Sequence, residues 1–124
     1  MPGVSAMRVL IVDDHQDTAE LFSMALRERG HDVTAVSTVA EAIGAYDDGC
    51  CEVVVCDLRL PDGDGWQLMR TLSTRHKMSG IALSGLGYAA DIERSRAAGF
   101  SAHLTKPVDL ETFVNAVESL SPCA

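Results

Sequence analysis

Five polar residues, each at the end of a short apolar run, have the chemistry of a single ligand site. They are Asp13, Asp14, Asp57, Ser84 and Lys106. Clustered carboxylates repel one another and are stabilised by a divalent cation, while a hydroxyl and an ammonium group suit a phosphoryl group. If the apolar runs are parallel strands, all five side chains meet at the edge where open α/β sheets bind ligands.

The sequence between these residues alternates between strand and helix patterns. The expected strands cover 7–13, 31–36, 53–57, 80–84 and 101–105, and the expected helices cover 15–29, 38–48, 66–75, 89–98 and 110–120. Residues 58–65 are expected to form a loop because they contain Pro61, Gly63 and Gly65. Five strand–helix repeats predict a parallel sheet with helices on both faces. We therefore expect one domain over 1–124, with its core at about 7–120.

Several details of these elements follow from local rules. Gly30 suits a left-handed cap at the end of the first helix, and Thr38 with Glu41 matches a capping box at the start of the second. Asp109 is expected to cap the last helix. The helix over 89–98 has Ile92 as its only large apolar residue, so it should shift more easily than its neighbours.

The composition excludes several classes of function. The chain has 124 residues, 47% of them hydrophobic, and a formal net charge of −8. An acidic surface disfavours binding to nucleic acid and to anionic lipid. No apolar stretch approaches the roughly 20 residues of a membrane helix, and the start has no signal-peptide pattern. The four cysteines form no Cys-x-x-Cys pair, which makes zinc improbable. We expect a cytoplasmic protein.

Four fragments, taken in order, resemble a known family. They are Val12-Asp13-Asp14, the run from Cys56 to Gly65 (CDLRLPDGDG), Ala82-Leu83-Ser84-Gly85 and Leu104-Thr105-Lys106-Pro107. Together they are similar to the response regulator receiver domain, the CheY-like module of two-component signalling, over about Met7 to Leu120. The resemblance implies a flavodoxin-like (βα)5 fold, a doubly wound parallel five-stranded sheet with strand order 2-1-3-4-5.

The resemblance also implies a role for each site residue. Asp57 would be the phosphoacceptor, and Asp13, Asp14, Asp57 and the backbone carbonyl of Arg59 would hold Mg²⁺. Lys106 would pair with Asp57 and with its phosphoryl group. Ser84 would be the switch hydroxyl. The Lys106–Pro107 bond is expected to be cis by resemblance.

Three neighbouring positions are expected to tune the switch. His103 stands where the family usually has an aromatic residue that swings inward on activation. An imidazole can also rotate, which makes His103 a switch candidate, and a surface histidine at the strand edge is the alternative. Arg59 and Leu86 lie two residues beyond Asp57 and Ser84, and in the family that this chain resembles such positions tune how fast the phosphoryl group hydrolyses, by their access to the attacking water. Because Leu86 cannot position water, we expect a long-lived phosphoryl state.

The remaining aromatic and histidine residues are expected to be peripheral. His15, His31 and His76 are predicted to lie at the surface, and no two of them have metal-ligand spacing. Trp66 is expected to pack partly on the helix that it begins, where it could report cation binding by its fluorescence.

The sequence thus predicts a phosphorylation-dependent switch that catalyses only its own phosphorylation and dephosphorylation. A histidine kinase or histidine phosphotransfer protein would supply the phosphoryl group. The output would pass to a downstream protein target through the helix at 89–98, the fifth strand and the last helix. The alternative is a degenerate receiver that binds proteins without phosphorylation. The chain could be a stand-alone receiver or a module of a hybrid histidine kinase.

Two enzymatic or cofactor-binding alternatives fit the motifs less well. A flavin-binding module of this fold would need a phosphate-binding loop after the first strand, where this chain has Asp13-Asp14. An aspartate-nucleophile phosphatase would need an Asp-x-Asp motif at that same place, and this chain has Asp13-Asp14-His15 instead.

Overall fold

Five parallel strands form the central sheet. The middle strand and its two neighbours each end at or next to a predicted site residue. The structure is a computed structural model that describes residues 6–48, 51–75, 78–85 and 89–120. In spatial order the strands are β2 (Asp32–Val36), β1 (Arg8–Val12), β3 (Val53–Asp57), β6 (Ser79–Ser84) and β7 (Ala102–Thr105). This is the expected 2-1-3-4-5 order, because a short hairpin carries the labels β4 and β5.

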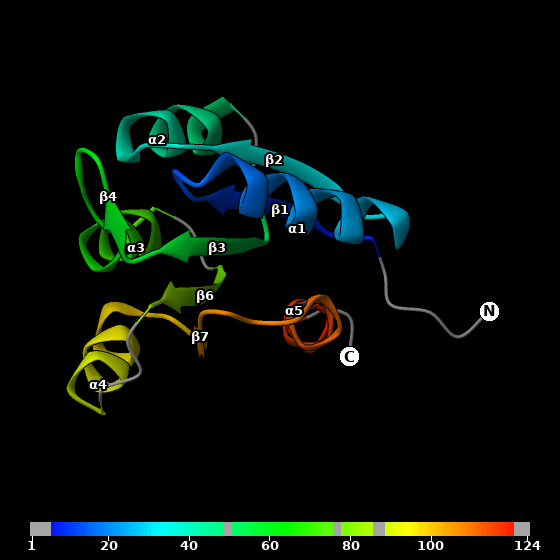
Figure 1. The fold of residues 1–124 in the computed structure, drawn as a ribbon. Coiled ribbons are helices and arrows are strands. Elements are labelled where there is room, and N and C mark those ends of the chain that lie inside the picture. Colours follow the sequence, from blue (N-terminus) through cyan, green and yellow to red (C-terminus); the bar gives the residue numbers. More distant parts are fainter. Residues whose placement is uncertain (1–5, 49–50, 76–77, 86–88, 121–124) are drawn as a thin grey trace.

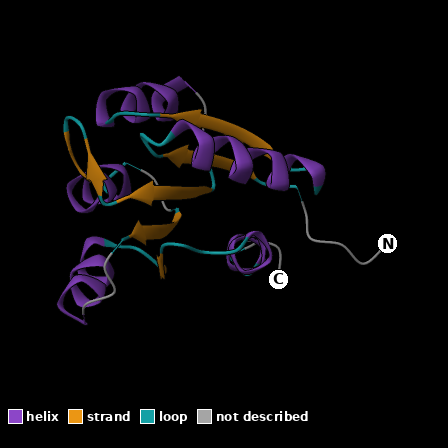
Figure 2. Ribbon diagram, viewed as in Figure 1, coloured by secondary structure: helices purple, strands orange, loops and turns teal. Residues whose placement is uncertain are grey.

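Four helices connect these strands, a fifth follows the last strand, and together they cover both faces of the sheet (Figure 1). They are α1 (Gln16–Glu28), α2 (Val39–Asp48), α3 (Gly65–Ser73), α4 (Ala89–Ala98) and α5 (Leu110–Glu118). The alternation of orange strands and purple helices along the chain is visible in Figure 2. The expected fold class, a doubly wound α/β sheet, is confirmed.

Alternate side chains of the strands divide the core into two layers. The first layer lies under α1 and α5, where the rings of Phe22 and Phe113 stack with centroids 4.0 Å apart. The second lies under α2, α3 and α4 and includes Tyr46, Leu68 and Phe100. All five residues of β3 are buried, as expected for a central strand whose two faces are both covered.

Residues 58–65 were expected to be a loop, and this prediction was wrong in part. Arg59–Leu60 (β4) pairs antiparallel with Gly63–Asp64 (β5), which leaves Pro61 and Asp62 as a two-residue turn. The Asp62 carboxylate accepts hydrogen bonds from the backbone N–H groups of Val39 at 2.8 Å and Ala40 at 3.1 Å. The hairpin therefore caps the N-terminus of α2, and these bonds lower the pKa of Asp62, with that from Val39 contributing most.

The predicted helix ends are confirmed at three places. Gly30 has a φ of +92°, the left-handed conformation expected after α1. Glu41 N–H donates to Thr38 Oγ1 at 3.1 Å, while Glu41 Oε1 accepts from the N–H of Ser37 rather than that of Thr38. Asp109 Oδ1 accepts from Thr112 N–H at 2.7 Å. The Lys106–Pro107 bond is cis, as expected.

His31 is buried, which contradicts its assignment to the surface. Its Nδ1 accepts from the N–H of Met7 at 3.1 Å, so Nε2 carries the hydrogen and donates to Glu118 Oε2 at 3.0 Å. Arg29 donates two further hydrogen bonds to the same carboxylate. These contacts tie the end of α1 and the start of β1 to the end of α5, and the bonds from Arg29 are the main cause of the lowered pKa of Glu118.

The described helices include none with the length and apolar character needed to span a bilayer.

Two glycine substitutions test how closely the chain packs beneath the predicted site. A Cβ on Gly65 would lie 2.7 Å from the carbonyl oxygen of Asp57, whereas a Cβ on Gly44, inside α2, would meet no atom within 4 Å. Gly65→Ala should lower the free energy of unfolding by about 1–3 kcal/mol. Gly44→Ala should raise it by about 0.5–1 kcal/mol, because helical glycine is entropically unfavourable. Urea denaturation measures both changes, and equal effects of the two would contradict this packing.

Candidate functional site

The strand register brings the predicted site residues to one edge of the sheet. Val12 pairs with Cys56 in the β1–β3 ladder, so Asp13 and Asp57 follow on adjacent strands. Ser84 ends β6 and pairs with Thr105 of β7, and the N–H of Lys106 then donates to the carbonyl of Ser84 at 2.7 Å. The prediction that these residues meet at the carboxyl edge is confirmed.

Lys106 connects two of the carboxylates directly. Its Nζ lies 3.0 Å from Asp13 Oδ2 and 3.1 Å from Asp57 Oδ2. The Asp13 side chain is fully buried and that of Asp57 is 9% exposed, so solvent screens these ion pairs only weakly. The other oxygen of Asp57, Oδ1, accepts from the N–H of Arg59 at 3.2 Å. Both oxygens of Asp57 are thus oriented by donors.

Burial and crowding shift the ionisation of this pair. Burial raises the pKa of Asp57, and the nearby charge of Asp13 raises it further. The hydrogen bond from the Arg59 N–H and the charge of Lys106 lower this pKa, but the net shift is upward. Burial lowers the pKa of Lys106, but the carboxylates of Asp13 and Asp57 outweigh it and raise that pKa overall. The charged form of Asp57 therefore remains costly even beside a lysine.

His15 belongs to the same cluster, although its residue type suggested an ordinary surface histidine. Its Nδ1 lies 3.1 Å from Asp13 Oδ1, 3.3 Å from Asp14 Oδ1 and 3.8 Å from Asp57 Oδ2. The side chain is 66% exposed, so the surface prediction holds for its solvent contact but missed these neighbours. Its position directly after two acidic residues was the feature that could have indicated the contact.

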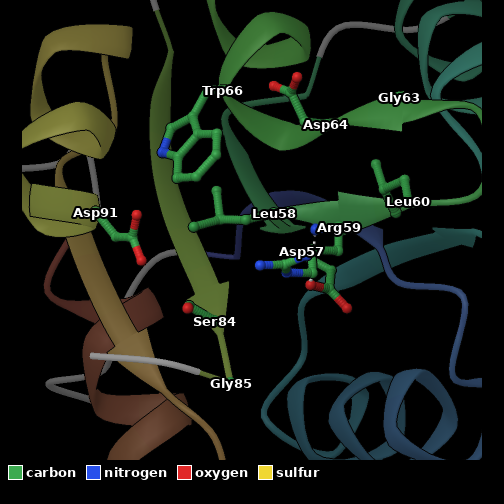
Figure 3. A pocket seen from close by; sticks show the side chains of 10 residues that line it. All are labelled: Asp57, Leu58, Arg59, Leu60, Gly63, Asp64, Trp66, Ser84, Gly85 and Asp91. Atoms are coloured by element: carbon green, nitrogen blue, oxygen red, sulfur yellow. Dashed lines mark hydrogen bonds between the residues drawn. The ribbon is translucent and has the colours of Figure 1, made fainter. Parts of the chain in front are cut away.

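A pocket of about 410 Å³ lies beside Asp57 (Figure 3). Asp57, Arg59 and Ser84 line it together with Trp66 and Asp91. Asp57 is thus shared between the acidic cluster and this pocket. The space beside its carboxylate has the hydroxyl of Ser84 at its wall, as a bound phosphoryl group would require.

The acidic cluster suits a hard divalent cation. One ligand atom from each of Asp13, Asp14, His15 and Asp57 can be chosen so that all lie within 4.8 Å of one another. Carboxylate oxygens are the ligands that Mg²⁺ prefers, so the donor set fits the expected cofactor. Arg59 lies at the site through its N–H, and the role of its carbonyl stays a prediction.

His103 is connected to α4 and α3 by a chain of hydrogen bonds. Its Nδ1 lies 3.0 Å from Ser95 Oγ on α4, and the same hydroxyl accepts from Trp66 Nε1 on α3 at 3.0 Å. Because Ser95 accepts from Trp66, its own hydrogen is available to His103 Nδ1. The guanidinium of Arg94 covers the Trp66 ring at 3.9 Å. Trp66 therefore packs against α4, and not only on its own helix as expected.

The sequence did not identify Ser95, because a lone serine in a helix gives no signal of such a role. Leu86, which was expected to affect phosphoryl lifetime, lies outside the described residues, as does His76.

The raised pKa of Asp57 predicts how its removal affects stability. The folded state binds this proton more tightly than the unfolded state, whose ordinary pKa is 3.8. Stability from this group is therefore present below that pKa and lost as pH rises through the folded pKa. Asp57→Asn should raise the free energy of unfolding at neutral pH without divalent cations, and the gain should shrink on acidification.

Urea denaturation in EDTA across this pH range measures the effect. Asp17→Asn, which removes an exposed carboxylate from the first turn of α1, is the control and should show no such gain. An Asp57→Asn protein less stable than wild type at neutral pH would contradict the prediction.

Ser95→Ala tests the connection between His103 and Trp66. Loss of the shared hydroxyl should cost about 1–3 kcal/mol, because Ser95 is buried and serves two partners. It should also change the emission of Trp66, the only tryptophan of the chain. Ser119→Ala, which removes an exposed hydroxyl bonded only within its own helix segment, should leave the emission unchanged. Unaltered emission in Ser95→Ala would show that this bond does not form.

Comparison with known proteins agrees with this arrangement. A family model described as the response regulator receiver domain matches residues 9–118. An uncharacterised 14.6 kDa protein of Leptolyngbya boryana is 31% identical over 112 residues, which cover 88% of this chain and 86% of that protein. The transcriptional regulatory protein TcrA of Mycobacterium tuberculosis is 31% identical over 95% of this chain, but this chain spans only 47% of TcrA.

Solved structures show the same fold. The crystal structure of a CheY-like response regulator receiver domain protein from Methanospirillum hungatei is 25% identical, with a TM-score of 0.87 and 94% of each chain covered. The order of the strands, the cluster at their carboxyl ends and the family match over most of the chain lead to one conclusion. This chain belongs to the receiver domain family of two-component response regulators.

Proposed function

We propose that this chain is a phosphorylation switch that accepts a phosphoryl group on Asp57 with the help of Mg²⁺. The donor is the phosphohistidine of a sensor histidine kinase or of a histidine phosphotransfer protein. The observation that carries the proposal is the placement of Lys106 Nζ between Asp13 and Asp57, at a sheet edge that opens into a pocket lined by Ser84. The proposed unit is one receiver domain over 1–124.

The transfer step is a displacement at phosphorus. A carboxylate oxygen of Asp57 forms a bond to phosphorus while the bond between phosphorus and the donor imidazole nitrogen breaks. The imidazole leaves with the bonding electron pair and takes up a proton. Lys106 and the N–H of Arg59 orient the two Asp57 oxygens before the donor arrives, which lowers the entropic part of the barrier.

The cation would be held by Asp13, Asp14, Asp57 and the carbonyl of Arg59. When bound, Mg²⁺ would neutralise charge on the nucleophile and on the phosphoryl oxygens. Lys106 Nζ donates to both Asp13 Oδ2 and Asp57 Oδ2. Because an ammonium group has three hydrogens, Lys106 could also donate to a phosphoryl oxygen and still keep its bond to Asp13.

Ser84 is proposed to respond to the added phosphoryl group. Its hydroxyl would donate to a phosphoryl oxygen, and Ser84 is continuous with β6, the neighbour of β7 in the sheet. Movement there reaches His103 on β7, and through Ser95 it reaches α4 and Trp66. The face formed by α4, β7 and α5 is the proposed docking surface for a downstream protein target. The switch thus acts through a local electrostatic change that biases a two-state element.

The degenerate receiver is the second candidate, and no feature of the site favours it. Each residue type that phosphorylation needs is present at the same edge: the acidic pair, the acceptor, the hydroxyl and the lysine. A module that signals only by protein contact would not require this combination.

Intact mass after incubation with acetyl phosphate tests the proposal. The wild-type chain with Mg²⁺ should gain one phosphoryl group, and Asp57→Asn or added EDTA should abolish the gain. Asp91→Asn is a matched control, because Asp91 lines the same pocket but lies outside the acidic cluster; it should be phosphorylated like wild type.

Two outcomes would contradict the proposal. One is an equal mass gain in Asp57→Asn, which would place the phosphoryl group elsewhere. The other is no gain by wild type with either acetyl phosphate or a phosphorylated histidine phosphotransfer protein, which would favour the degenerate receiver.

A further inference from the structure

We propose that His15 adds an imidazole nitrogen to the oxygen ligands of the cation site, so that its affinity for Co²⁺, Ni²⁺ or Zn²⁺ relative to Mg²⁺ is higher than the oxygen ligands alone would give. This inference rests on the proposed function, because it concerns the cation that the acidic cluster would hold. The sequence alone predicted a set of oxygen ligands only, and His15 is the addition that the structure makes.

The distances around His15 match those within a coordination shell. Neighbouring ligands of an octahedral ion with bonds of about 2.1 Å lie about 3 Å apart, and opposite ligands lie about 4.2 Å apart. The separations of His15 Nδ1 from Asp13 Oδ1 and Asp14 Oδ1, 3.1 and 3.3 Å, are those of neighbouring ligands. The 3.8 Å to Asp57 Oδ2 falls between the two values.

The backbone explains why the imidazole lies there. His15 occupies the N-cap position of α1 in an extended conformation (φ −87°, ψ 99°), and its side chain makes no capping hydrogen bond to that helix. Its own N–H instead donates to Asp13 Oδ1 at 2.9 Å. This tight turn directs the ring back over the acidic residues, while 66% of the side chain stays exposed to solvent.

Lys106 and His15 use different oxygens of Asp13. Lys106 pairs with Oδ2, whereas His15 contacts Oδ1. A cation bound through Oδ1 and the imidazole would therefore leave the bond between Lys106 and Asp13 intact. Without the cation, a hydrogen on Nδ1 can be donated to Oδ1; with it, the Nδ1 lone pair binds the metal and the hydrogen lies on Nε2.

An imidazole ligand changes the selectivity of the site. Carboxylates and water suit Mg²⁺, whereas imidazole nitrogen suits the later first-row divalent ions. Three carboxylates alone would bind Mg²⁺ and Co²⁺ through the same kind of atom. One nitrogen ligand adds affinity mainly for Co²⁺ and similar ions. The ratio of the Co²⁺ affinity to the Mg²⁺ affinity therefore measures whether His15 is a ligand.

Proton NMR of the Co²⁺-loaded chain in water provides the direct test. A histidine bound to Co²⁺ should give an exchangeable imidazole N–H resonance shifted far outside the usual range. Wild type should show this resonance and His15→Gln should lose it. His103→Gln, which alters a histidine on β7 outside the acidic cluster, should retain it.

Titration with each ion measures the selectivity. His15→Gln should weaken Co²⁺ binding by about tenfold or more, because mutating even the residues that only orient metal ligands typically costs about 10–100-fold. Mg²⁺ affinity should change by less than about twofold, because Mg²⁺ prefers oxygen. Competition by Mg²⁺ should displace Co²⁺ from wild type, and Asp13→Asn should lose both ions, which excludes binding at the cysteines.

The outcomes separate this inference from the proposed function. If Mg²⁺ supports labelling by acetyl phosphate but Co²⁺ gives no imidazole resonance, or if His15→Gln leaves the Co²⁺ affinity unchanged, His15 is not a ligand and the switch still stands. If wild type binds neither ion and is not labelled, the proposed cation site itself is overturned, and the inference fails with it.

Discussion

Crowding of negative charge at the carboxyl end of the sheet is the constraint on which the site depends. Asp13, Asp14 and Asp57 stand close enough for their carboxylates to share one ligand shell, and a single lysine bridges two of them. One ammonium cannot neutralise three carboxylates, so the folded chain holds an excess of charge in a weakly screened place. A bound cation would neutralise that excess, and it is this charge balance on which the proposed acceptance of a phosphoryl group by Asp57 depends.

The elements around Asp57 are packed tightly on one side of the site and loosely on the other. The hairpin of β4 and β5 begins two residues after Asp57 and is bound to α2 through Asp62. Close packing of Gly65 beneath the Asp57 carbonyl joins α3 to the same segment. On the opposite side, α4 buries only Ser95 and Ala98. Asp57 is thus anchored toward α2 and α3, and the weakly packed helix α4 lies on the opposite side.

Most of the fold and the predicted site could be read from the sequence because their causes are local. Apolar runs followed by polar residues marked the strand ends, and parallel strands necessarily bring such ends together, which explains why Asp13, Asp57, Ser84 and Lys106 were found. The burial of His31 could not be predicted, because it depends on Glu118, which lies 87 residues away. The contacts of Ser95 were missed for the same reason, because they depend on residues of other elements. His15 differs, because its partners Asp13 and Asp14 directly precede it, and only the direction of its ring could not be predicted.

The attachment of α4 has a thermodynamic consequence. This helix is held by a polar chain through Ser95 and by a cation–π contact at Trp66, and not by a broad apolar stripe. Releasing it exposes little apolar surface, so the heat capacity should change little. The free energy of releasing α4 should then vary almost linearly with temperature. The free energy of unfolding of the whole domain, in contrast, should be a curved function of temperature. The release of α4 would thus lack the temperature of maximum stability that the unfolding of the whole domain shows.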